Sequence, residues 1–415
     1  MDAIFRNKFT VAFLTLTILI DFMGMAIVVV LFPKLLLGSN IIFSSLWSHN
    51  DRYIAMGLLM AVYPLGQIFG ASTLGKLSDF YGRKKLLVLT LFGTLVGFML
   101  SGVAVLIGSV TLLFSSRLLA GLCAGNVAIA QAGLIDISTD ETKTKNISWG
   151  QLAMGSGYII GPVLGAVLSN PAMVSWFSMS TPFWAISFIL AGLIALTVTS
   201  FKETNLKPKR EKINLLESFS QIYLGLISKQ LRVVFGVWLL FVSGWWLFES
   251  FMPTYLMTSL NYSTTQIGTI LSFNGILYAS FQYIVVQRLA KNFKPANMFK
   301  FSTIFVALSI MSLTVISTIL QLYIAMSVFV MAMGFAIPGI ITFISNLADK
   351  NEQGQVMGIV NSIQAVSTVL VMISAGYLYA ININIAIIIS GVLVILSCLC
   401  FISLLVKKKL QVATN

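Results

Sequence analysis

The sequence predicts an all-α membrane protein whose twelve transmembrane helices form two six-helix bundles. Of its 415 residues, 58% are hydrophobic and only 9% are charged, and the mean hydropathy is +0.94. A soluble domain carries roughly 25% charged residues, so most of the outer surface of this chain must face lipid. Apolar runs long enough to span a bilayer recur along the chain, and the longest charged stretch lies between the sixth and the seventh of them.

The spans follow from apolar runs that are broken by charges or by clusters of Pro, Gly and Asn. Their expected limits are 9–33, 53–74, 86–106, 110–134, 147–168, 181–201, 232–257, 265–287, 298–319, 321–345, 354–377 and 382–406. The first run carries Asp21 in its middle, which does not fit a cleavable signal peptide. This number of spans excludes a peripheral or single-span protein.

The positive charges predict the orientation, because Lys and Arg concentrate in cytoplasmic connections. With both termini in the cytoplasm, the inside segments hold 23 of the 26 Lys and Arg residues. The outside connections hold only Lys34 and Arg52, and Arg117 lies within a span. The net charge of +13 therefore reflects topology, and no nucleic-acid partner is expected.

The charged stretch also predicts the domain organisation. Residues 202–231, which include KETNLKPKREK, form a cytoplasmic linker between an amino-terminal bundle, 1–201, and a carboxy-terminal bundle, 232–415. In each half a basic connection follows the second helix, at 75–85 and at 287–296. This weak repeat is of the parallel kind found when two bundles are related by an axis along the membrane normal.

No signature of an enzyme or a metalloprotein is visible in the sequence. Cys123, Cys398 and Cys400 all lie within apolar runs, so neither a disulfide framework nor a zinc site is indicated. The chain shows no nucleophile–base pair, no metal cluster and no phosphate-binding loop. We therefore expect no catalytic residues, no metal and no cofactor.

The turn between the second and third spans carries the most specific motif. Gly75-Lys-Leu-Ser-Asp79-Phe-Tyr-Gly82-Arg83-Lys-Lys resembles the G-x-L-a-D-r-x-G-r-k/r-x signature of the major facilitator superfamily. Glycines permit a tight turn and a close helix approach, and Asp79 can cap a helix or accept from an arginine. The resemblance implies that Gly75, Asp79, Gly82 and Arg83 form a conformational latch against the eleventh helix; the alternative is an ordinary basic turn.

Two further motifs support the same family. The fourth span carries Arg117-x-x-x-Gly121-x-x-x-Gly125, which resembles the family's R-x-x-x-G-x-x-x-G pattern. Glycines at a spacing of four allow a neighbouring helix to come close. An arginine within a membrane needs a carboxylate, carbonyl groups or water as a partner, unless it snorkels to the surface.

The fifth span resembles the G-P-x-x-G-G motif of the antiporter branch. It contains Gly157, Gly161, Pro162 and Gly165, and Ala166 replaces the last glycine of the pattern. A proline bends a helix and glycines permit tight packing. The resemblance implies an antiporter hinge at these four residues, and the alternative is a kinked packing helix.

The first span narrows the resemblance to one branch. Asp21-Phe-Met-Gly24, followed by Pro33, is similar to the D-x-x-G…P pattern of the tetracycline-efflux-like drug:proton antiporters. The resemblance covers most of residues 10–205, whereas the second half is similar to the superfamily only in general terms. It therefore does not identify the substrate.

Asp21, Arg117 and Glu249 are the clearly intramembrane charges, and each is a functional candidate by default. The resemblance implies that the first, fourth, seventh and tenth helices line a central cavity and place these three side chains on the transport path. A carboxylate in a low-dielectric site readily binds a proton, and an arginine that moves next to it favours the ionised form again. We expect Asp21 or Glu249 to carry the proton and Arg117 to tune or lock one of them. The alternative is that both acids only satisfy nearby donors.

Aromatic and amide side chains supply the candidates for the substrate cavity. Trp245 and Phe248 lie at helical spacing beside Glu249, and an aromatic cavity with one acid suits an amphipathic or cationic solute. These rings could also be core or lipid-facing residues. The other cavity candidates are the amides of Gln67, Asn126, Gln131 and Asn274.

These features together predict a secondary transporter that works by alternating access. Its expected function is proton-coupled efflux of an amphipathic small molecule, such as a drug, a siderophore or another metabolite. Proton-coupled uptake of a nutrient or siderophore is the alternative, and a non-transporting membrane sensor or assembly factor is a third. The expected partners are the small-molecule substrate, protons and the lipid bilayer. We expect a functional monomer in a bacterial inner membrane.

Overall fold

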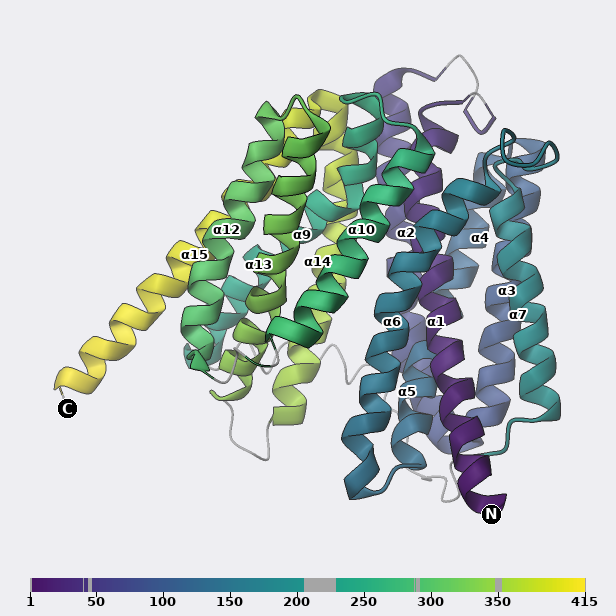
Figure 1. The fold of residues 1–415 in the computed structure, drawn as a ribbon, viewed down its shortest axis with the longest axis horizontal. Helices are drawn as coiled ribbons and strands as arrows, with labels where there is room; N and C mark the ends of the chain where they lie inside the picture. The colour runs from purple at the N-terminus through teal and green to yellow at the C-terminus, as the bar shows by residue number, and fades with distance from the viewer. Residues whose placement is uncertain are drawn as a thin grey trace. The chain divides into compact units, whose positions relative to one another are not determined.

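The computed structural model of the chain describes residues 2–39, 41–43, 47–204, 229–286, 288, 292–347 and 353–414. These residues form helices joined by short connections, and the helices follow the chain in order (Figure 1). Within the described part, twelve helical segments are long and apolar enough to cross a membrane. The predicted all-helical class and the predicted number of spans are therefore confirmed.

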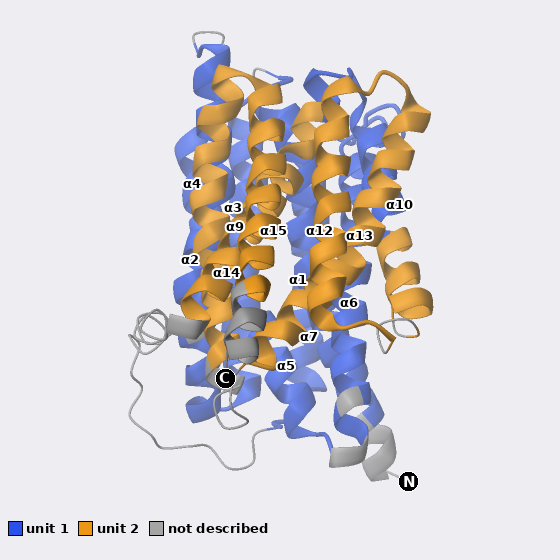
Figure 2. Cartoon of the chain, turned by 90° about the vertical axis from the view of Figure 1, so that its left-hand side faces the viewer, with its two compact units in different colours: residues 1–215, 256–275 blue, residues 216–255, 276–415 orange. Residues whose placement is uncertain are grey.

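Two compact units make up the chain (Figure 2). Unit 1 comprises Met1–Leu215 and Leu256–Gly275, and unit 2 comprises Leu216–Tyr255 and Ile276–Asn415. The predicted linker, 202–231, lies mostly outside the described residues, so the predicted division of the chain at this linker stays a prediction.

The first seven helices of unit 1 carry most of the intramembrane motifs. They are α1 (Asp2–Leu36), α2 (His49–Tyr81), α3 (Arg83–Ile107), α4 (Val110–Leu122), α5 (Asn126–Asp136), α6 (Asp140–Leu168) and α7 (Thr181–Thr199). α1 packs along α6, α3 along α7, and α2 along α4. The beginning of α10 (Thr264–Phe281) also belongs to this unit.

The expected fourth span, 110–134, is interrupted near its middle. α4 ends at Leu122, Cys123–Gly125 form a turn, and α5 begins at Asn126. An added Cβ on Gly125 would lie 2.7 Å from Cβ of Leu74 in α2, so only glycine allows this close packing. The break places Asn126 at the first position of a new helix.

Unit 2 contains most of α9 and the helices that follow α10. Their bounds are α9 (Lys229–Thr258), the π-helix η1 (Gln282–Val286), α12 (Pro295–Ser312), the 3₁₀ turn η3 (Leu313–Val315), α13 (Ile319–Ser345), α14 (Gln353–Ile381) and α15 (Ile383–Thr414). Side chains tie α9 to two neighbours: the Trp238 indole donates to the carbonyl of Val360 in α14 (3.1 Å), and the Ser397 hydroxyl of α15 donates to the carbonyl of Val237 (2.8 Å).

Candidate functional site

Glycines of α6 set the position of α1, which carries Asp21. A Cβ added to Gly157 would lie 2.7 Å from the carbonyl oxygen of Leu19 in α1. One added to Gly161 would lie 2.7 Å from the carbonyl oxygen of Met23. At Gly165 the same atom would lie 3.2 Å from the carbonyl oxygen of Ile27. The two backbones are thus in contact over three successive turns, and the glycines allow this close packing. The predicted hinge at Gly157, Gly161, Pro162 and Gly165 remains a prediction.

Asp21 lies in a polar cluster with Asn126 and Thr94. The amide nitrogen of Asn126 donates to the Asp21 carboxylate at 3.0 Å and to the Thr94 hydroxyl at 3.2 Å. Asn126 is fully buried, and its amide oxygen has no hydrogen-bond partner among the described residues. The sequence predicts Asn126 as a cavity residue but not its bond to Asp21, because an uninterrupted apolar run, 110–134, does not show the break between α4 and α5.

Arg117 is buried between aromatic rings of unit 1. The residue is 2% exposed, and the guanidinium carbon lies 4.7 Å from the ring centre of Tyr63 in α2 and 5.5 Å from that of Phe98 in α3. Its Nη1 atom has no hydrogen-bond partner among the residues that the structure describes. This burial does not match the snorkelling alternative.

The close approach of α2 and α4 explains this geometry. An added Cβ on Gly66 would lie 2.8 Å from the backbone nitrogen of Leu122, and one on Gly121 would collide with the carbonyl of Tyr63. Glycines on both helices therefore let Tyr63 lie under the guanidinium, where a cation–π contact is worth about 0.5–2 kcal/mol. In the described part of the chain neither Asp21 nor Arg117 forms an ion pair, so the predicted coupling of Arg117 to an acid stays a prediction.

The latch residues form a charged network where α2 ends and α3 begins. Arg83 contacts three groups: its Nη2 lies 2.5 Å from Oδ1 of Asp79, its Nε donates to Asp136 at 2.9 Å, and its Nη1 donates to the Ser78 hydroxyl at 2.5 Å. Gly82 has a φ of 98°, a conformation that favours glycine.

Gly75 differs from Gly82, because an added Cβ there would meet its nearest atom, Cβ of Ala128, only at 3.8 Å. The network includes Asp136, the last residue of α5, which the sequence motif does not contain. The role of Gly75, Asp79, Gly82 and Arg83 as a conformational latch remains a prediction.

In unit 2, Glu249 accepts a hydrogen bond from the indole of Trp245, one helical turn before it on α9. The Trp245 ring stacks on Trp246 with centroids 5.3 Å apart. Phe248 is 3% exposed and packs edge-on against Phe329 of α13, with centroids 4.8 Å apart. The structure therefore places Phe248 in the core of unit 2, and a place for it in the cavity stays a prediction.

The remaining amide candidates occupy separate places. Gln67 is half-buried, one turn after Tyr63 on α2. Gln131 is half-buried on α5, and its amide lies 3.8 Å from the sulfur of Met154 in α6. Asn274 is half-buried on α10. Their role in substrate binding stays a prediction.

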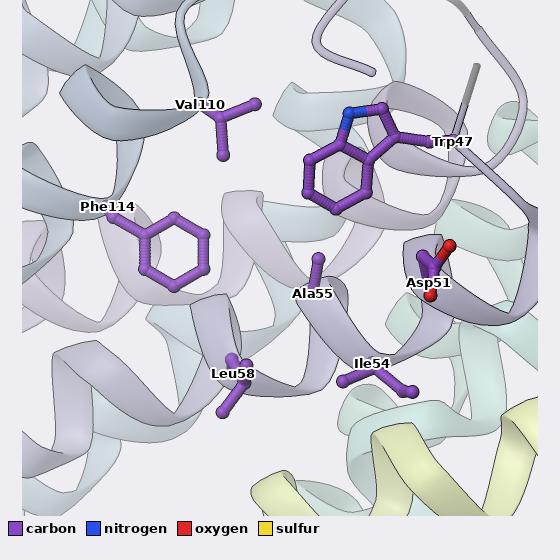
Figure 3. A pocket seen from close by; sticks show the side chains of 7 residues that line it. All are labelled: Trp47, Asp51, Ile54, Ala55, Leu58, Val110 and Phe114. Atoms are coloured by element: carbon purple, nitrogen blue, oxygen red, sulfur yellow. The ribbon is translucent and has the colours of Figure 1, made fainter. Parts of the chain in front are cut away.

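A pocket of about 540 Å³ lies between α2 and α4, where both helices begin (Figure 3). The residues that line it are Trp47, Asp51, Ile54, Ala55, Leu58, Val110 and Phe114, and the rings of Trp47 and Phe114 extend into it from opposite sides. Asp51 takes part in the start of α2, because the Ser48 hydroxyl donates to its carboxylate (2.7 Å) and its backbone N–H donates to Ser48 (3.1 Å). None of the site residues predicted from the sequence lines this pocket.

Comparison with known proteins identifies the family. The model of the Major Facilitator Superfamily matches residues 14–372 and 234–414, which together cover most of the chain. The chain belongs to the major facilitator superfamily. It is consequently an integral, multi-pass membrane transporter and not an enzyme.

Distant relatives of the chain include proteins named for drug resistance. The chain is 24% identical over 397 residues to the class H tetracycline resistance protein of Pasteurella multocida, covering 91% of this chain and 90% of the relative. It is also 24% identical over 387 residues to multidrug resistance protein 1 of Bacillus subtilis, covering 91% of this chain and 92% of that protein.

Solved structures of the superfamily share the fold. The D-xylose-proton symporter matches with a TM-score of 0.74 at 14% identity, covering 96% of this chain and 97% of its own. The human organic anion transporter MFSD10 (TETRAN) matches with a TM-score of 0.69 at 17% identity, and the match covers 95% of this chain and 99% of that one. These likenesses confirm the major facilitator fold.

Proposed function

We propose that this protein is a proton-coupled efflux transporter that exchanges protons for an amphipathic small molecule by alternating access. The observation that carries the proposal is the contact between Asp21 and Asn126, two buried or half-buried side chains of membrane-spanning helices. The partner of the carboxylate is a neutral amide and not a fixed cation. Asp21 can therefore bind and release a proton without breaking an ion pair.

The chemistry of Asn126 suits both states of this carboxyl group. An asparagine side chain has two N–H donors and an acceptor oxygen. Its nitrogen donates to ionised Asp21, whereas its oxygen, which has no partner among the described residues, can accept from the protonated acid after the amide turns over. A partner that satisfies both states keeps the energy difference between them small, as reversible proton coupling requires.

Efflux is supported by the relatives, which include tetracycline and multidrug resistance proteins. The cationic and aromatic groups of unit 1 and the aromatic surroundings of Glu249 suit amphipathic solutes. The distribution of Lys and Arg supports cytoplasmic termini, and the bacterial relatives support a bacterial inner membrane. We propose a monomer as the functional unit.

The direction of coupling is tested in proteoliposomes with an imposed pH gradient and a clamped membrane potential. The probes are radiolabelled tetracycline, norfloxacin and ethidium, and protein-free liposomes correct for passive accumulation. An acidic lumen should drive accumulation of at least one probe, because protons leave as the solute enters. Accumulation only with an acidic exterior would instead establish symport, and no gradient-driven flux of a wider solute panel would contradict transport by this mechanism.

A further inference from the structure

Glu203 lies just after α7, outside every motif of the sequence, yet both of its carboxylate oxygens bind the start of α3. Oε1 accepts from the backbone N–H of Arg83 at 2.8 Å, and Oε2 accepts from that of Lys84 at 3.1 Å. These are the first two N–H groups of a helix, which have no partner within the helix itself. A carboxylate at this end is also favoured by the helix dipole.

The residue before α3 cannot supply this cap. Gly82 occupies the N-cap position, has no side chain and has a φ of 98°. An added Cβ there would lie 2.5 Å from Oε2 of Glu203, so a capping serine or aspartate would displace the carboxylate. Gly82 thus leaves the space that Glu203 fills, although Glu203 follows Arg83 by 120 positions in the sequence.

Neighbouring contacts fix the segment that presents Glu203. The Phe201 ring packs against Phe13 of α1 with centroids 4.8 Å apart, and Phe201 is 1% exposed. On the α3 side, the Lys84 ammonium donates to the carbonyl of Val198 near the end of α7 at 2.9 Å. Glu203 is therefore held in place on both sides.

We infer that Glu203 is a positioning residue for Arg83: its carboxylate fixes the first turn of α3 so that the Arg83 side chain reaches Asp79 and Asp136. The backbone of Arg83 is bound by Glu203, while its side chain binds the two aspartates at 2.5 and 2.9 Å. Arg83 thus binds Glu203 through its backbone and Asp136 through its side chain, which makes it the link through which we expect these two acids to be coupled.

A double-mutant cycle tests this inference without relying on transport. Glu203→Gln places an amide N–H₂ against a backbone N–H and loses one of the two hydrogen bonds. Thermal unfolding of the purified full chain is compared for E203Q, D136N and the double variant. If Glu203 positions Arg83, D136N should lower the midpoint clearly less in the E203Q background than in the wild type.

The matched controls use Asp51 and Lys202. Asp51→Asn removes a carboxylate from the first turn of α2, away from this network, so its effect should add to that of E203Q. Lys202→Gln changes the charge of an exposed neighbour and should leave the midpoint unchanged. Additive effects of E203Q and D136N would overturn the inference, since Glu203 would then only cap α3.

Hydrogen exchange supplies a second readout. Amides at the start of α3, in peptides that span residues 82–92, should exchange about tenfold faster in E203Q than in the wild type. Glu203→Asp retains the charge and should recover part of the protection. Unchanged exchange in E203Q would also overturn the inference.

A third readout concerns transport and rests on the proposed function. If Arg83 acts in the conformational cycle, E203Q should lower the maximal rate of tetracycline exchange while leaving its KM unchanged, and E203D should restore part of the rate. A normal rate in E203Q, together with faster hydrogen exchange, would overturn the role of Glu203 in the cycle. Failure of the wild type to move any probe would count against the proposed function alone, because the mutant cycle decides the positioning of Arg83 independently.

Discussion

The side-chain amide of Asn126 donates one hydrogen bond to the Asp21 carboxylate at 3.0 Å and a second to the Thr94 hydroxyl at 3.2 Å. Three helices, α1, α3 and α5, thus meet at one polar cluster. The break between α4 and α5 makes this contact possible, because it sets Asn126 at the start of a helix.

Replacing Asn126 by leucine should shift the pH profile of transport upward. The substitution removes the donor to ionised Asp21, so the proton is held up to a higher pH. A hydrogen bond to a charged group is worth about 1.5–3 kcal/mol, which corresponds to about one to two pH units. The measurement is the rate of tetracycline exchange in proteoliposomes as a function of pH.

Thr94→Val is the matched control for this prediction. It removes the second acceptor of Asn126 but leaves the bond to Asp21 intact, so the profile should shift less than in N126L. Equal profiles for N126L and the wild type would show that Asn126 does not influence the titrating group.

Arg117→Met should keep the fold and lose transport. In the wild type the buried guanidinium makes a cation–π contact with Tyr63, and its Nη1 atom has no hydrogen-bond partner among the described residues. Removal of an unpaired buried charge does not destabilise a protein strongly. We expect an unfolding temperature close to that of the wild type and an exchange rate lower by at least about tenfold, or 1.4 kcal/mol. A normal rate in R117M would contradict a role for Arg117 in transport, and a collapse of stability would show a structural one.

Two glycines of α6 should respond in opposite ways to the same substitution. In Gly161→Ala the new methyl group would lie 2.7 Å from the carbonyl of Met23, whereas Gly155 has nothing within 4 Å. Overpacking costs about 1–3 kcal/mol, while alanine in an open helical position gains up to about 1 kcal/mol over glycine. The unfolding temperature in detergent should therefore fall for G161A and stay the same or rise for G155A. Equal shifts of the two unfolding temperatures would contradict the contact between α1 and α6.

Adjacent tryptophans of α9 provide a matched pair in unit 2. Trp245 donates to Glu249, whereas the indole nitrogen of Trp246 is buried without a hydrogen-bond partner in the described part of the chain. Trp245→Phe should alter the pH profile of transport, because Glu249 loses its donor, and Trp246→Phe should leave it unchanged. If both variants behave alike, the hydrogen bond to Glu249 has no part in coupling.

The sequence alone was sufficient for the class of fold. Twelve apolar runs mark twelve membrane-spanning segments, because lipid requires long apolar helices and charges can lie only between them. The latch motif was also visible, since residues 75–85 resemble the signature of the superfamily and Asp79 can accept from an arginine. Asp21 and Arg117 are functional candidates from the sequence because a charged side chain within a membrane is costly.

Contacts between distant segments could not be read in the same way. Glu203 looked like one more charge at the start of a linker, and only the fold brings it to Arg83. Asn126 was an amide among several, because nothing in a single sequence indicates that the turn at Cys123–Gly125 points it toward Asp21. Phe248 lies at helical spacing with Trp245, which predicts a place in the cavity. Its burial against Phe329 depends on how α13 packs on α9 and is not visible in the sequence.

Gradient-driven uptake by Asp21→Asn proteoliposomes tests the central proposal most directly, with Glu249→Gln as its counterpart in unit 2. With an acidic lumen, wild-type vesicles should accumulate tetracycline above the protein-free level. D21N should lose this accumulation and retain exchange of labelled for unlabelled tetracycline without a gradient, because a folded carrier without its proton site can still turn over. Full gradient-driven accumulation in both D21N and E249Q would contradict proton coupling through these carboxylates.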